Sequence, residues 1–497
     1  MSTAFAVLES GAYMFERLIA FQASQRPDAI AIETAIQQFT YSDLAVDIAR
    51  CAHWLTRLDL PVGARALLNV QHPYLHWVLT FGLEAVGVVT AATAAAQAVP
   101  GDLTLLKAEV LFSGEVPLAP VGVPHHVIDA AWLRALEAYP LTYAGFAAER
   151  RRTLDDPCRI VVTSGTTGTR KKILLTRGMI DRRTTNSLLS KVFTKPNLRA
   201  ISNIGVGSIG GFMLALACWG LGGTLCHHDD SISWAESLAR LKIDVFLLAP
   251  YHLQQLLRAL PDDFAPHPDL TLCIGGGSLS KPLAADARQR LSRNILVSYG
   301  ATETGSVALG HLELMAGGEE AAGFVFPWAD VEVLSPEGKV LPPGQIGEIR
   351  IRGDELVDGY LDNPEGSEAR FRDGWFWPGD LGAVSAAGVL QVMGRTDDLM
   401  NIGGSKFLAG RLEALVLRVE GVLDAAAFVA PDEQQLDAPY VAYVANDDLD
   451  LTPLRMIFTQ SLGREARLLR VSEIPRNAMG KIRRDVLRGQ LAESKAA

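Results

Sequence analysis

Short runs of β-branched and other apolar residues alternate along this chain with longer segments of helical periodicity. We expect strands at 66–70, 88–93, 159–165, 244–250, 270–277 and 294–297, with helices over 74–87 and 252–260. Parallel strands cannot be joined by a tight hairpin, and a helix usually makes the crossover connection. The alternation therefore predicts an α/β fold whose large N-terminal domain contains parallel sheets flanked by helices.

The pattern changes over residues 326–395. Turn signals at Pro-Glu-Gly and Pro-Pro-Gly separate short strand-like segments there, and they predict antiparallel hairpins in a small barrel-like β subdomain. Later elements are expected as helices over 411–420 and 451–462 and strands over 425–430 and 440–446. We therefore expect an N-terminal domain over 1–398 and a small α+β C-terminal domain over 399–497, with the boundary at Asp397-Asp398.

The charge balance argues against several classes of partner. The 497 residues include 46 Lys and Arg against 56 Asp and Glu, a net charge of −10. Such an acidic chain is poorly suited to bind nucleic acid or an anionic membrane surface. An anionic ligand needs local positive charge, and residues 464–497 supply some, with nine basic and four acidic side chains.

One uncharged segment, residues 200–226, is long enough to cross a bilayer. It contains seven glycines, however, and is followed by His227-His228-Asp229-Asp230 where a membrane span is often followed by basic residues. We expect a buried core segment that lines a pocket, and no membrane span.

The cysteines and the N-terminus favour a cytoplasmic protein. Cys51, Cys158, Cys218, Cys226 and Cys273 are far apart and form no Cys-x-x-Cys pair, so the sequence indicates neither a zinc site nor a disulfide framework. The first residues lack the basic region of a secretory signal peptide.

A Ser/Thr/Gly-rich turn with the sequence TSGTTGTRKK occupies residues 163–172, directly after an expected strand. Its glycines allow several backbone N–H groups to face one anion, and its hydroxyls add donors. Lys171 adds a point charge suited to a polyphosphate. The turn differs from the Walker motif, so taken alone it is also compatible with an ordinary surface turn.

Four further motifs follow in order: SYGATETG at 298–305, GWFWPGD at 374–380, GRTDD at 394–398 with Gly403-Gly404 behind it, and IPRNAMGKI at 474–482. In this order the motifs resemble those of the adenylate-forming superfamily, which includes acyl-CoA synthetases, adenylation domains of peptide synthetases and beetle luciferase. The resemblance covers essentially the whole chain, including 39–55 and 83–93.

The resemblance implies a ligase that works in two half-reactions. A carboxylate attacks the α-phosphorus of Mg·ATP, pyrophosphate leaves, and an acyl-adenylate forms. The thiol of coenzyme A then attacks this mixed anhydride and gives a thioester. The first step gathers negative charge around phosphorus, so positioning and electrostatic stabilisation should dominate catalysis.

The same resemblance assigns the nucleotide-binding residues. The β/γ-phosphates would be wrapped by Thr163, Ser164, Gly165, Thr166, Thr167, Gly168 and Lys171. The adenine site would comprise Tyr299, which stacks on the base, with Gly276, Gly277 and Ser278 as the opposite wall and Gly300 and Ala301 beside it. Asp380 would accept hydrogen bonds from the ribose hydroxyls, and Arg395 would contact the same sugar.

Three residues are implied to be catalytic. Glu303 would hold Mg²⁺, which prefers hard oxygen ligands, and Thr302 would lie near the α-phosphate. Lys481 would reach into the site and bridge the substrate carboxylate and the nucleotide. A cation there neutralises the repulsion between two anions that must approach to bonding distance.

The resemblance also makes the C-terminal domain a mobile lid. Asp397 would be the hinge, and rotation about it would withdraw the Lys481 loop and bring Gly403 and Gly404 to the thiol channel. A hinge needs only a few residues that absorb the change in backbone angles.

Three positions depart from the family pattern. Arg170 replaces the usual proline and adds charge near the phosphates, Pro378 replaces a threonine before Gly379-Asp380, and Ser208 replaces an aromatic residue or histidine. None of these changes deletes a charged catalytic group, so we expect activity.

The substrate pocket is expected to draw on Gly207, Ser208, Phe212, Gly275, Ala301 and Gly305. These residues are small or apolar, with no aspartate to hold an α-ammonium group. An aromatic or aliphatic carboxylic acid is therefore favoured over an amino acid.

Several alternatives stay open. The acyl group could be loaded onto the phosphopantetheine of a carrier protein acting in trans, in place of coenzyme A. A non-catalytic nucleotide- or acyl-binding protein and a luciferase-like oxygenase are the other classes, and the oligomeric state is left open.

Overall fold

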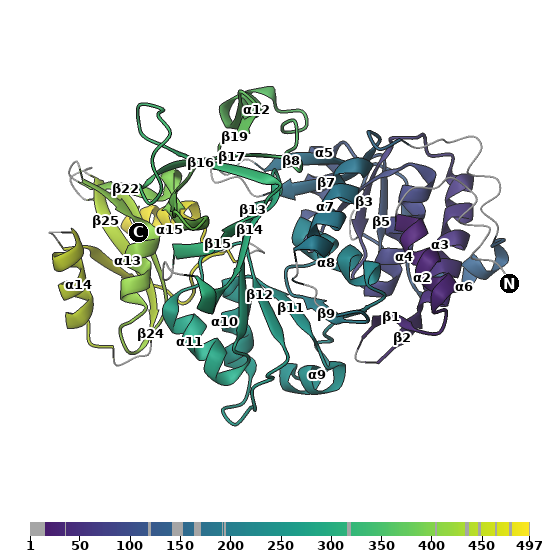
Figure 1. Ribbon diagram of the computed structural model, residues 1–497, viewed down its shortest axis with the longest axis horizontal. Helices are drawn as coiled ribbons and strands as arrows, with labels where there is room; N and C mark the ends of the chain where they lie inside the picture. Colours follow the sequence, from purple (N-terminus) through teal and green to yellow (C-terminus); the bar gives the residue numbers. More distant parts are fainter. Residues whose placement is uncertain are drawn as a thin grey trace.

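The computed structural model describes residues 15–34, 36–117, 121–141, 153–163, 170–190, 192, 195–315, 320–402, 405–432, 437–445, 449–462, 465–476 and 480–496. Two large sheets and a small C-terminal sheet follow one another across the molecule (Figure 1). The alternation of strand and helix patterns in the sequence thus predicted the α/β class correctly.

The first large sheet has six strands in the order β6-β5-β3-β4-β7-β8. Their bounds are β3 Arg65–Asn69, β4 Val89–Ala92, β5 Val110–Ser113, β6 His125–Val127, β7 Pro157–Thr163 and β8 Lys171–Thr176. All neighbours are parallel except β7 and β8, which form an antiparallel pair. Helices α2 (Phe15–Gln25), α3 (Tyr41–Leu55), α4 (Pro73–Val86), α5 (Val99–Leu106) and α6 (Ala130–Ala135) belong to this half of the molecule.

The second large sheet joins a parallel half to an antiparallel half. Its parallel strands are β1 Ile30–Glu33, β9 Arg199–Ser202, β10 Thr224–Cys226, β11 Val245–Leu248, β12 Thr271–Ile274 and β13 Asn294–Ala301. Strand β2 (Gln38–Thr40) pairs antiparallel with β1. The helices of this half are α7 Arg177–Leu189, α8 Ile209–Gly220, α9 Trp234–Leu241, α10 Pro250–Ala259 and α11 Lys281–Arg290.

The antiparallel half contains the hairpins expected from the Pro-Gly turns. Its strands are β14 Gly305–His311, β15 Ala321–Val325, β16 Ala329–Leu334, β17 Gly347–Gly353, β18 Phe371–Arg372, β19 Trp375–Phe376, β20 Asp380–Val384 and β21 Val389–Arg395, with α12 at Pro364–Arg370. Strands β13 and β14 are hydrogen-bonded, so this β subdomain is continuous with the parallel half.

The C-terminal elements form sheets and core clusters of their own. They are β22 Leu399–Ile402, β23 Ser405–Leu408, α13 Ala409–Val416, β24 Val422–Pro431, β25 Asp437–Ala445, α14 Thr452–Leu462, β26 Arg467–Arg470 and α15 Arg484–Ala496. One core cluster includes Val416 and Phe458, another includes Phe428 and Leu487, and every member of both lies beyond residue 399. This arrangement fits a division at residues 398 and 399, which stays a prediction.

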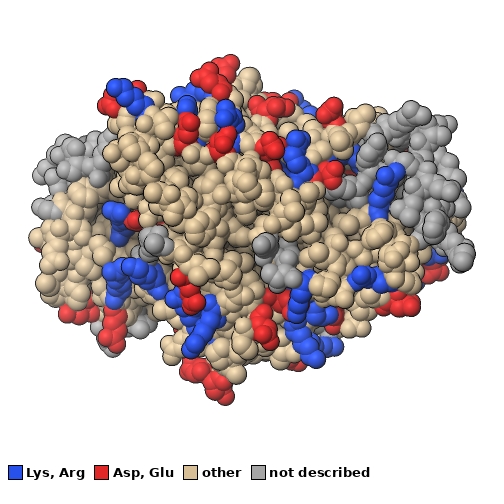
Figure 2. All heavy atoms as spheres, viewed as in Figure 1, with Lys and Arg blue, Asp and Glu red and all other residues tan. Residues whose placement is uncertain are grey.

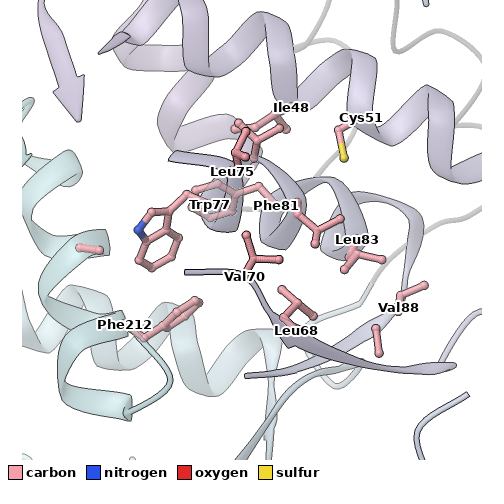
Figure 3. Packing of buried hydrophobic residues seen from close by; sticks show 14 of the residues in the cluster. Ile48, Cys51, Leu68, Val70, Leu75, Trp77, Phe81, Leu83, Val88 and Phe212 are labelled. Atoms are coloured by element: carbon pink, nitrogen blue, oxygen red, sulfur yellow. The ribbon is translucent and has the colours of Figure 1, made fainter. Parts of the chain in front are cut away.

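The glycine-rich segment 200–226 is divided among β9, α8 and β10. Helix α8 has 12 residues, and no helix in the described ranges is long and apolar enough to cross a membrane. Phe212 of α8 points toward Trp77 of α4, with their ring centroids 5.5 Å apart, inside the largest apolar cluster (Figure 3). The segment is therefore part of the core between the two large sheets.

All five cysteines carry free thiols and are buried. On the face shown in Figure 2, basic and acidic side chains are interspersed, and neither sign forms a continuous patch across the described surface of this view.

Candidate active site

A cavity of about 560 Å³ lies between the end of the second large sheet and the C-terminal elements. Eight residues expected to bind nucleotide line it: Gly276, Gly277, Ser278, Tyr299, Gly300, Asp380, Arg395 and Lys481. They come from five separate stretches of the sequence, four of which are the motifs at 298–305, 374–380, 394–398 and 474–482. The fold therefore gathers distant motifs around one cavity.

The β-sheet explains why the adenine-site residues meet. Strands β12 and β13 are parallel neighbours, and Gly276–Ser278 follow the first while Tyr299 and Gly300 lie at the end of the second. Carboxyl ends of parallel strands lie at the same edge of a sheet, where ligand crevices commonly form. Gly276 has a φ of +78°, a conformation that glycine adopts at no steric cost.

Asp380 and Arg395 are brought together by strand pairing. Asp380 opens β20, Arg395 ends β21, and the two residues are directly opposite in the antiparallel register. The Arg395 Nη1 atom lies 3.6 Å from Asp380 Oδ1, while its Nη2 atom donates to the carbonyl of Pro378 at 2.7 Å. A carboxylate and a guanidinium thus face the same part of the cavity.

The Tyr299 hydroxyl donates a hydrogen bond to Asp380 Oδ2 at 2.5 Å. Burial and the adjacent carboxylate raise the pKa of the Tyr299 phenol, so it stays neutral and keeps its proton for this bond. The sequence did not reveal this link, because the two residues are 81 positions apart and belong to different motifs.

Lys481 enters the cavity from the C-terminal domain. Burial and the nearby guanidinium groups of Arg395 and Arg484 lower its pKa, while the carboxylates of Asp398 and Asp380 act in the opposite direction. The ammonium group therefore lies in the same electrostatic environment as the proposed ribose ligands.

The preceding residue, Gly480, fixes the approach of the Lys481 segment. It has a φ of +76°, and a Cβ atom added there would overlap the side chain of Tyr251 on α10. Arg476 donates from Nη1 to the Gly480 carbonyl and from Nη2 to Asp424 Oδ1, both at 2.7 Å. The guanidinium of Arg476 also lies 5.2 Å from the Tyr251 ring centroid.

A second polar group contains Lys171 and Glu303, which do not line the cavity described above. Lys171 Nζ donates to the Tyr360 hydroxyl at 3.2 Å, and this hydroxyl donates to Glu303 Oε1 at 2.9 Å. Burial and the Arg370 guanidinium lower the pKa of Lys171, and Glu303 opposes this shift. Tyr360 is thus a site residue that sequence reasoning missed.

The basic run at 170–172 divides between two sides of its segment, and the expectation that Arg170 adds charge near the phosphates stays a prediction. The Arg170 guanidinium forms an ion pair with Asp102, and Lys172 Nζ lies 2.7 Å from Asp362 Oδ2. Successive side chains of an extended segment point to opposite sides, so only Lys171 of these three residues contacts the Tyr360–Glu303 pair.

The phosphate-loop residues Ser164, Gly165, Thr166, Thr167 and Gly168 lie outside the described residues, as do Gly403 and Gly404. Thr163 ends β7 opposite Lys171, the first residue of β8. Thr163 and Lys171 thus end and begin two antiparallel neighbours.

The turn that carries Thr302 and Glu303 is supported by a buried network. Arg183 Nη2 donates to the carbonyls of Thr302 at 3.0 Å and Glu355 at 2.7 Å, and Asn186 donates to Glu355 Oε1 at 2.7 Å. Gly305 has a φ of +66°, and Glu355 occupies the space that a Cβ atom would need. Sequence reasoning also missed these supporting residues.

The residues expected to form the acyl pocket do not line the 560 Å³ cavity. Ser208 caps α8 by accepting from the Gly211 N–H at 3.1 Å. Phe212 is fully buried, with the Arg159 guanidinium 4.2 Å from its ring centroid, and Gly207 packs against the Ala92 backbone.

The remaining pocket residues lie near the Glu303 turn. Gly275 follows β12, and Ala301 pairs with Gly305 at the base of the turn that joins β13 to β14. They are therefore close in sequence or register to Tyr299 and Glu303.

Asp397 lies in the short turn Thr396–Asp398, between β21 and β22. Its Oδ2 atom lies 3.2 Å from Arg370 Nη2 and 3.8 Å from Arg395 Nη2. The expected hinge residue is thus ion-paired to the N-terminal domain in this structure.

Among the described residues, no group of three or more His, Cys, Asp and Glu side chains could hold a metal ion. Glu303 is 9% exposed, and Tyr360 occupies one of its oxygens. A single carboxylate with an available oxygen fits Mg²⁺, which proteins commonly bind through one or two carboxylates and substrate phosphates.

The α/β fold and this cavity define an enzyme of the adenylate-forming class. Residues 19–361 match the model of the AMP-binding enzyme family. The chain therefore belongs to the AMP-binding enzyme family, and the expected membership of the adenylate-forming superfamily is confirmed.

Curated relatives cover nearly the whole chain. A medium/long-chain-fatty-acid–[acyl-carrier-protein] ligase, FadD10 of Mycobacterium tuberculosis, is 26% identical over 96% of this chain and 95% of its own length. A 2-succinylbenzoate–CoA ligase of Listeria monocytogenes is also 26% identical, over 92% of this chain and 96% of its own.

Solved structures show the same fold. ATP-bound MatB from Rhodopseudomonas palustris has a TM-score of 0.82 at 23% identity, over 96% of this chain and 99% of that one. The o-succinylbenzoate CoA synthetase of Bacillus subtilis, in complex with its acyl-adenylate intermediate, has a TM-score of 0.79 at 21% identity, with 95% and 97% covered.

Proposed function

We propose that this chain uses ATP to activate a carboxylic acid as an acyl-adenylate, releases pyrophosphate, and transfers the acyl group to the thiol of coenzyme A. The observation that carries the proposal is the cavity in which Lys481 of the C-terminal domain joins Tyr299, Asp380 and Arg395 of the N-terminal domain. Relatives with names of acid–thiol ligases over nearly the full chain support the same reaction.

Different cavity residues bind the adenine and the ribose of the nucleoside. Tyr299 contributes an aromatic face to the adenine, with the backbone at Gly276 and Gly277 opposite. Asp380 accepts from the ribose hydroxyls through the carboxylate that Tyr299 and Arg395 hold in place. Preorganised groups of this kind cost little reorganisation when the ligand binds.

Lys481 acts on the reacting groups. The acid and the α-phosphate both carry negative charge, and their repulsion opposes the approach of the carboxylate oxygen to phosphorus. An ammonium group between them offsets this repulsion, and it does so most effectively in a partly desolvated cleft. Thr302 lies at the start of the Glu303 turn and acts on the α-phosphate.

The polyphosphate is held on the other side of the site. Lys171 and the loop from Thr163 contact the β- and γ-phosphates, and Glu303 supplies an oxygen ligand for Mg²⁺. When bound, the metal ion neutralises phosphate charge. The chain itself contributes the fixed placement of Lys171 and Glu303 around Tyr360.

The second half-reaction requires a thiol to reach the adenylate. The domain over 399–497 rotates about Asp397, Lys481 withdraws, and the Gly403-Gly404 loop reaches the thiol channel. Coenzyme A is the proposed acceptor, and the alternative is the phosphopantetheine of a carrier protein. The resemblance to FadD10 over nearly the full length is the observation that supports this alternative.

The acid is an aromatic or aliphatic one, because the expected pocket residues are small or apolar. The Glu355 carboxylate packs against Gly305, and its two oxygens already accept from Asn186 and from the Ser306 N–H. Glu303 is assigned to the metal ion, so neither carboxylate of this turn is assigned to an α-ammonium group. We place this chemistry in the cytoplasm.

The proposal is tested with a panel of carboxylic acids, read by ATP-dependent release of pyrophosphate and by the mass of the thioester formed with coenzyme A or with a carrier protein. At least one acid should release pyrophosphate. A thioester on the carrier but never on coenzyme A would select the alternative acceptor. No release with any acid, despite ATP binding, would favour a non-catalytic binding protein, and light emission with a luciferin would favour an oxygenase.

The role of Lys481 has its own control. Lys481→Ala should abolish acid-dependent ATP–pyrophosphate exchange, while Lys339→Ala, on an exposed hairpin turn, should leave it unchanged. Exchange that survives Lys481→Ala would show that the assignment is wrong.

A further inference from the structure

Tyr360 lies between two groups of opposite charge. It is 6% exposed, belongs to the largest apolar cluster, and its ring contacts Phe371 edge-on with centroids 5.3 Å apart. Lys171 contacts it twice, through the hydroxyl at 3.2 Å and over the ring face at 4.3 Å from the centroid. The phenol is thus held by packing and cannot easily move away from Lys171 and Glu303.

The direction of the two hydrogen bonds follows from the chemistry of the groups. An ammonium can only donate, an ionised carboxylate can only accept, and a phenol has one proton and can also accept. The Tyr360 hydroxyl therefore donates to Glu303 Oε1 and accepts from Lys171 Nζ. Burial and the Glu303 carboxylate raise the pKa of Tyr360, so the phenol keeps the proton that this arrangement needs.

The bridge separates Lys171 from Glu303. Within the described residues, no ion pair joins these two side chains at 4.0 Å or less, although the Glu303 charge raises the pKa of Lys171 against the effect of burial. A direct ion pair would direct the ammonium and the carboxylate at one another and would compete with any ligand. With the hydroxyl between them, each satisfies part of its hydrogen-bonding capacity and keeps the remainder for other groups.

We propose that Tyr360 is a positioning residue, which spaces Lys171 and Glu303 so that the first binds polyphosphate oxygens while the second binds the accompanying metal ion. This inference rests on the function proposed above and adds to it a residue that no motif indicated. Loss of this spacing should weaken the binding of MgATP but not that of AMP, because AMP lacks the β- and γ-phosphates.

Tyr360→Phe tests the proposal with little change in shape. The ring and its contacts with Phe371 remain, and only the bridging hydroxyl is lost. Hydrogen bonds to charged groups are stronger than neutral ones, so we expect binding of MgATP to weaken about tenfold or more, with AMP affinity changed by less than about twofold. Both affinities are measured by titration calorimetry on the full-length protein, which requires no knowledge of the acid.

The matched control is Tyr74→Phe. Tyr74 is also buried and donates to a carboxylate, Asp47 Oδ2, at 2.7 Å, but it does not line the cavity. This variant should bind MgATP and AMP like the unaltered protein. Thermal unfolding of both variants shows whether each is folded.

A double-mutant cycle gives a second, independent measurement. If Tyr360 acts through Glu303, the losses in MgATP affinity caused by Tyr360→Phe and Glu303→Gln should not add, and the double variant should be little worse than Glu303→Gln alone. Additive losses would overturn the proposal, as would equal weakening of MgATP and AMP, or unchanged MgATP affinity in Tyr360→Phe.

The two proposals can fail separately. If the unaltered protein binds MgATP but releases no pyrophosphate with any acid, the proposed function fails, and the ratio of MgATP to AMP affinities still decides the role of Tyr360. If pyrophosphate is released normally and the ratio is unchanged by Tyr360→Phe, only the positioning role fails. If the unaltered protein binds no MgATP, both fail.

Discussion

Gly480→Ala should slow adenylation without unfolding the C-terminal domain. Gly480 precedes Lys481 with a φ of +76°, and an added Cβ would overlap the Cβ and ring of Tyr251 on α10. The left-handed conformation costs an L-residue about 1–2 kcal/mol in any position of the lid. The overlap with Tyr251 acts only when the Lys481 segment lies against the N-terminal domain, as it does in this structure.

The size of the effect follows from the overlap. Forcing one extra carbon into a well-packed contact typically costs about 1–3 kcal/mol. At about 1.4 kcal/mol per factor of ten, this lowers the population of the Lys481-inserted arrangement, and with it the rate, by about 5- to 150-fold. The assay is acid-dependent ATP–pyrophosphate exchange at saturating ATP, with the free energy of unfolding measured in parallel.

Two further variants isolate the cause. Gly489→Ala, on α15 of the same domain, places a methyl group at an exposed position with no neighbouring element within 4 Å and away from the cavity, so it should leave the exchange rate unchanged. Tyr251→Gly in the Gly480→Ala background removes both the Cβ atom and the ring that the added methyl group would meet, so it should restore most of the lost rate, apart from the conformational cost. An unchanged rate in Gly480→Ala, or no recovery in the double variant, would refute the reasoning.

Three other perturbations have directions that the structure defines. The pKa of Lys481 is lowered below the usual lysine value of 10.5, so its ammonium is lost as pH rises through the lowered value. The exchange rate should therefore fall on the alkaline side below pH 10.5. Any activity that Lys481→Arg retains should persist to higher pH, and an identical alkaline limb in this variant would contradict the assignment. The Arg183 Nε atom lies 3.9 Å from Glu355 Oε2, so Arg183→Met leaves this buried carboxylate without its cation and should lower the free energy of unfolding by about 3–5 kcal/mol in urea titrations; a loss below about 1 kcal/mol would exclude this role. Burial lowers the pKa of His76 to about 3 and that of His227 to about 4, so near pH 6.5 the unfolded chain binds protons that the folded chain does not bind. The free energy of unfolding should be highest above that pH and decline below it by about 1.4 kcal/mol per pH unit for each histidine, with a smaller slope in His76→Gln. A flat profile between pH 6.5 and 4 would contradict this.

Local pattern was sufficient for single elements of the fold but not for their pairing. The helix expected over 74–87 is α4, Pro73–Val86, because apolar periodicity and the proline at its start are both local signals. Strand β1 pairs with β10, which lies about 190 residues later in the chain, and periodicity carries no information about such partners. The sheet order therefore could not be predicted.

The site shows the same division. Tyr299, Asp380 and Lys481 could be named because each belongs to a motif, and the cavity joins them. The pairing of Arg170 with Asp102 could not be predicted, because the two residues are 68 positions apart and no feature of a basic run shows which of its members pairs elsewhere. Tyr360 and Arg183 were missed for a related reason, since each acts through contacts with residues far along the chain.

The basic C-terminal tail needs a more local explanation than its net charge. Several of its arginines form ion pairs within the C-terminal domain or at its boundary: Arg476 with Asp424, Arg484 with Glu413 and Asp398, Arg467 with Asp432 and Arg483 with Asp485. Charges paired in this way contribute little field at a distance, and salt screens what remains. The position of the segment that enters the cavity depends instead on steric fit. A side chain at residue 480 would overlap Tyr251, and Arg476 holds the Gly480 carbonyl by a hydrogen bond. Under the proposed function Lys481 is therefore one positioned cation, while the arginines named above are paired within the C-terminal domain or at its boundary.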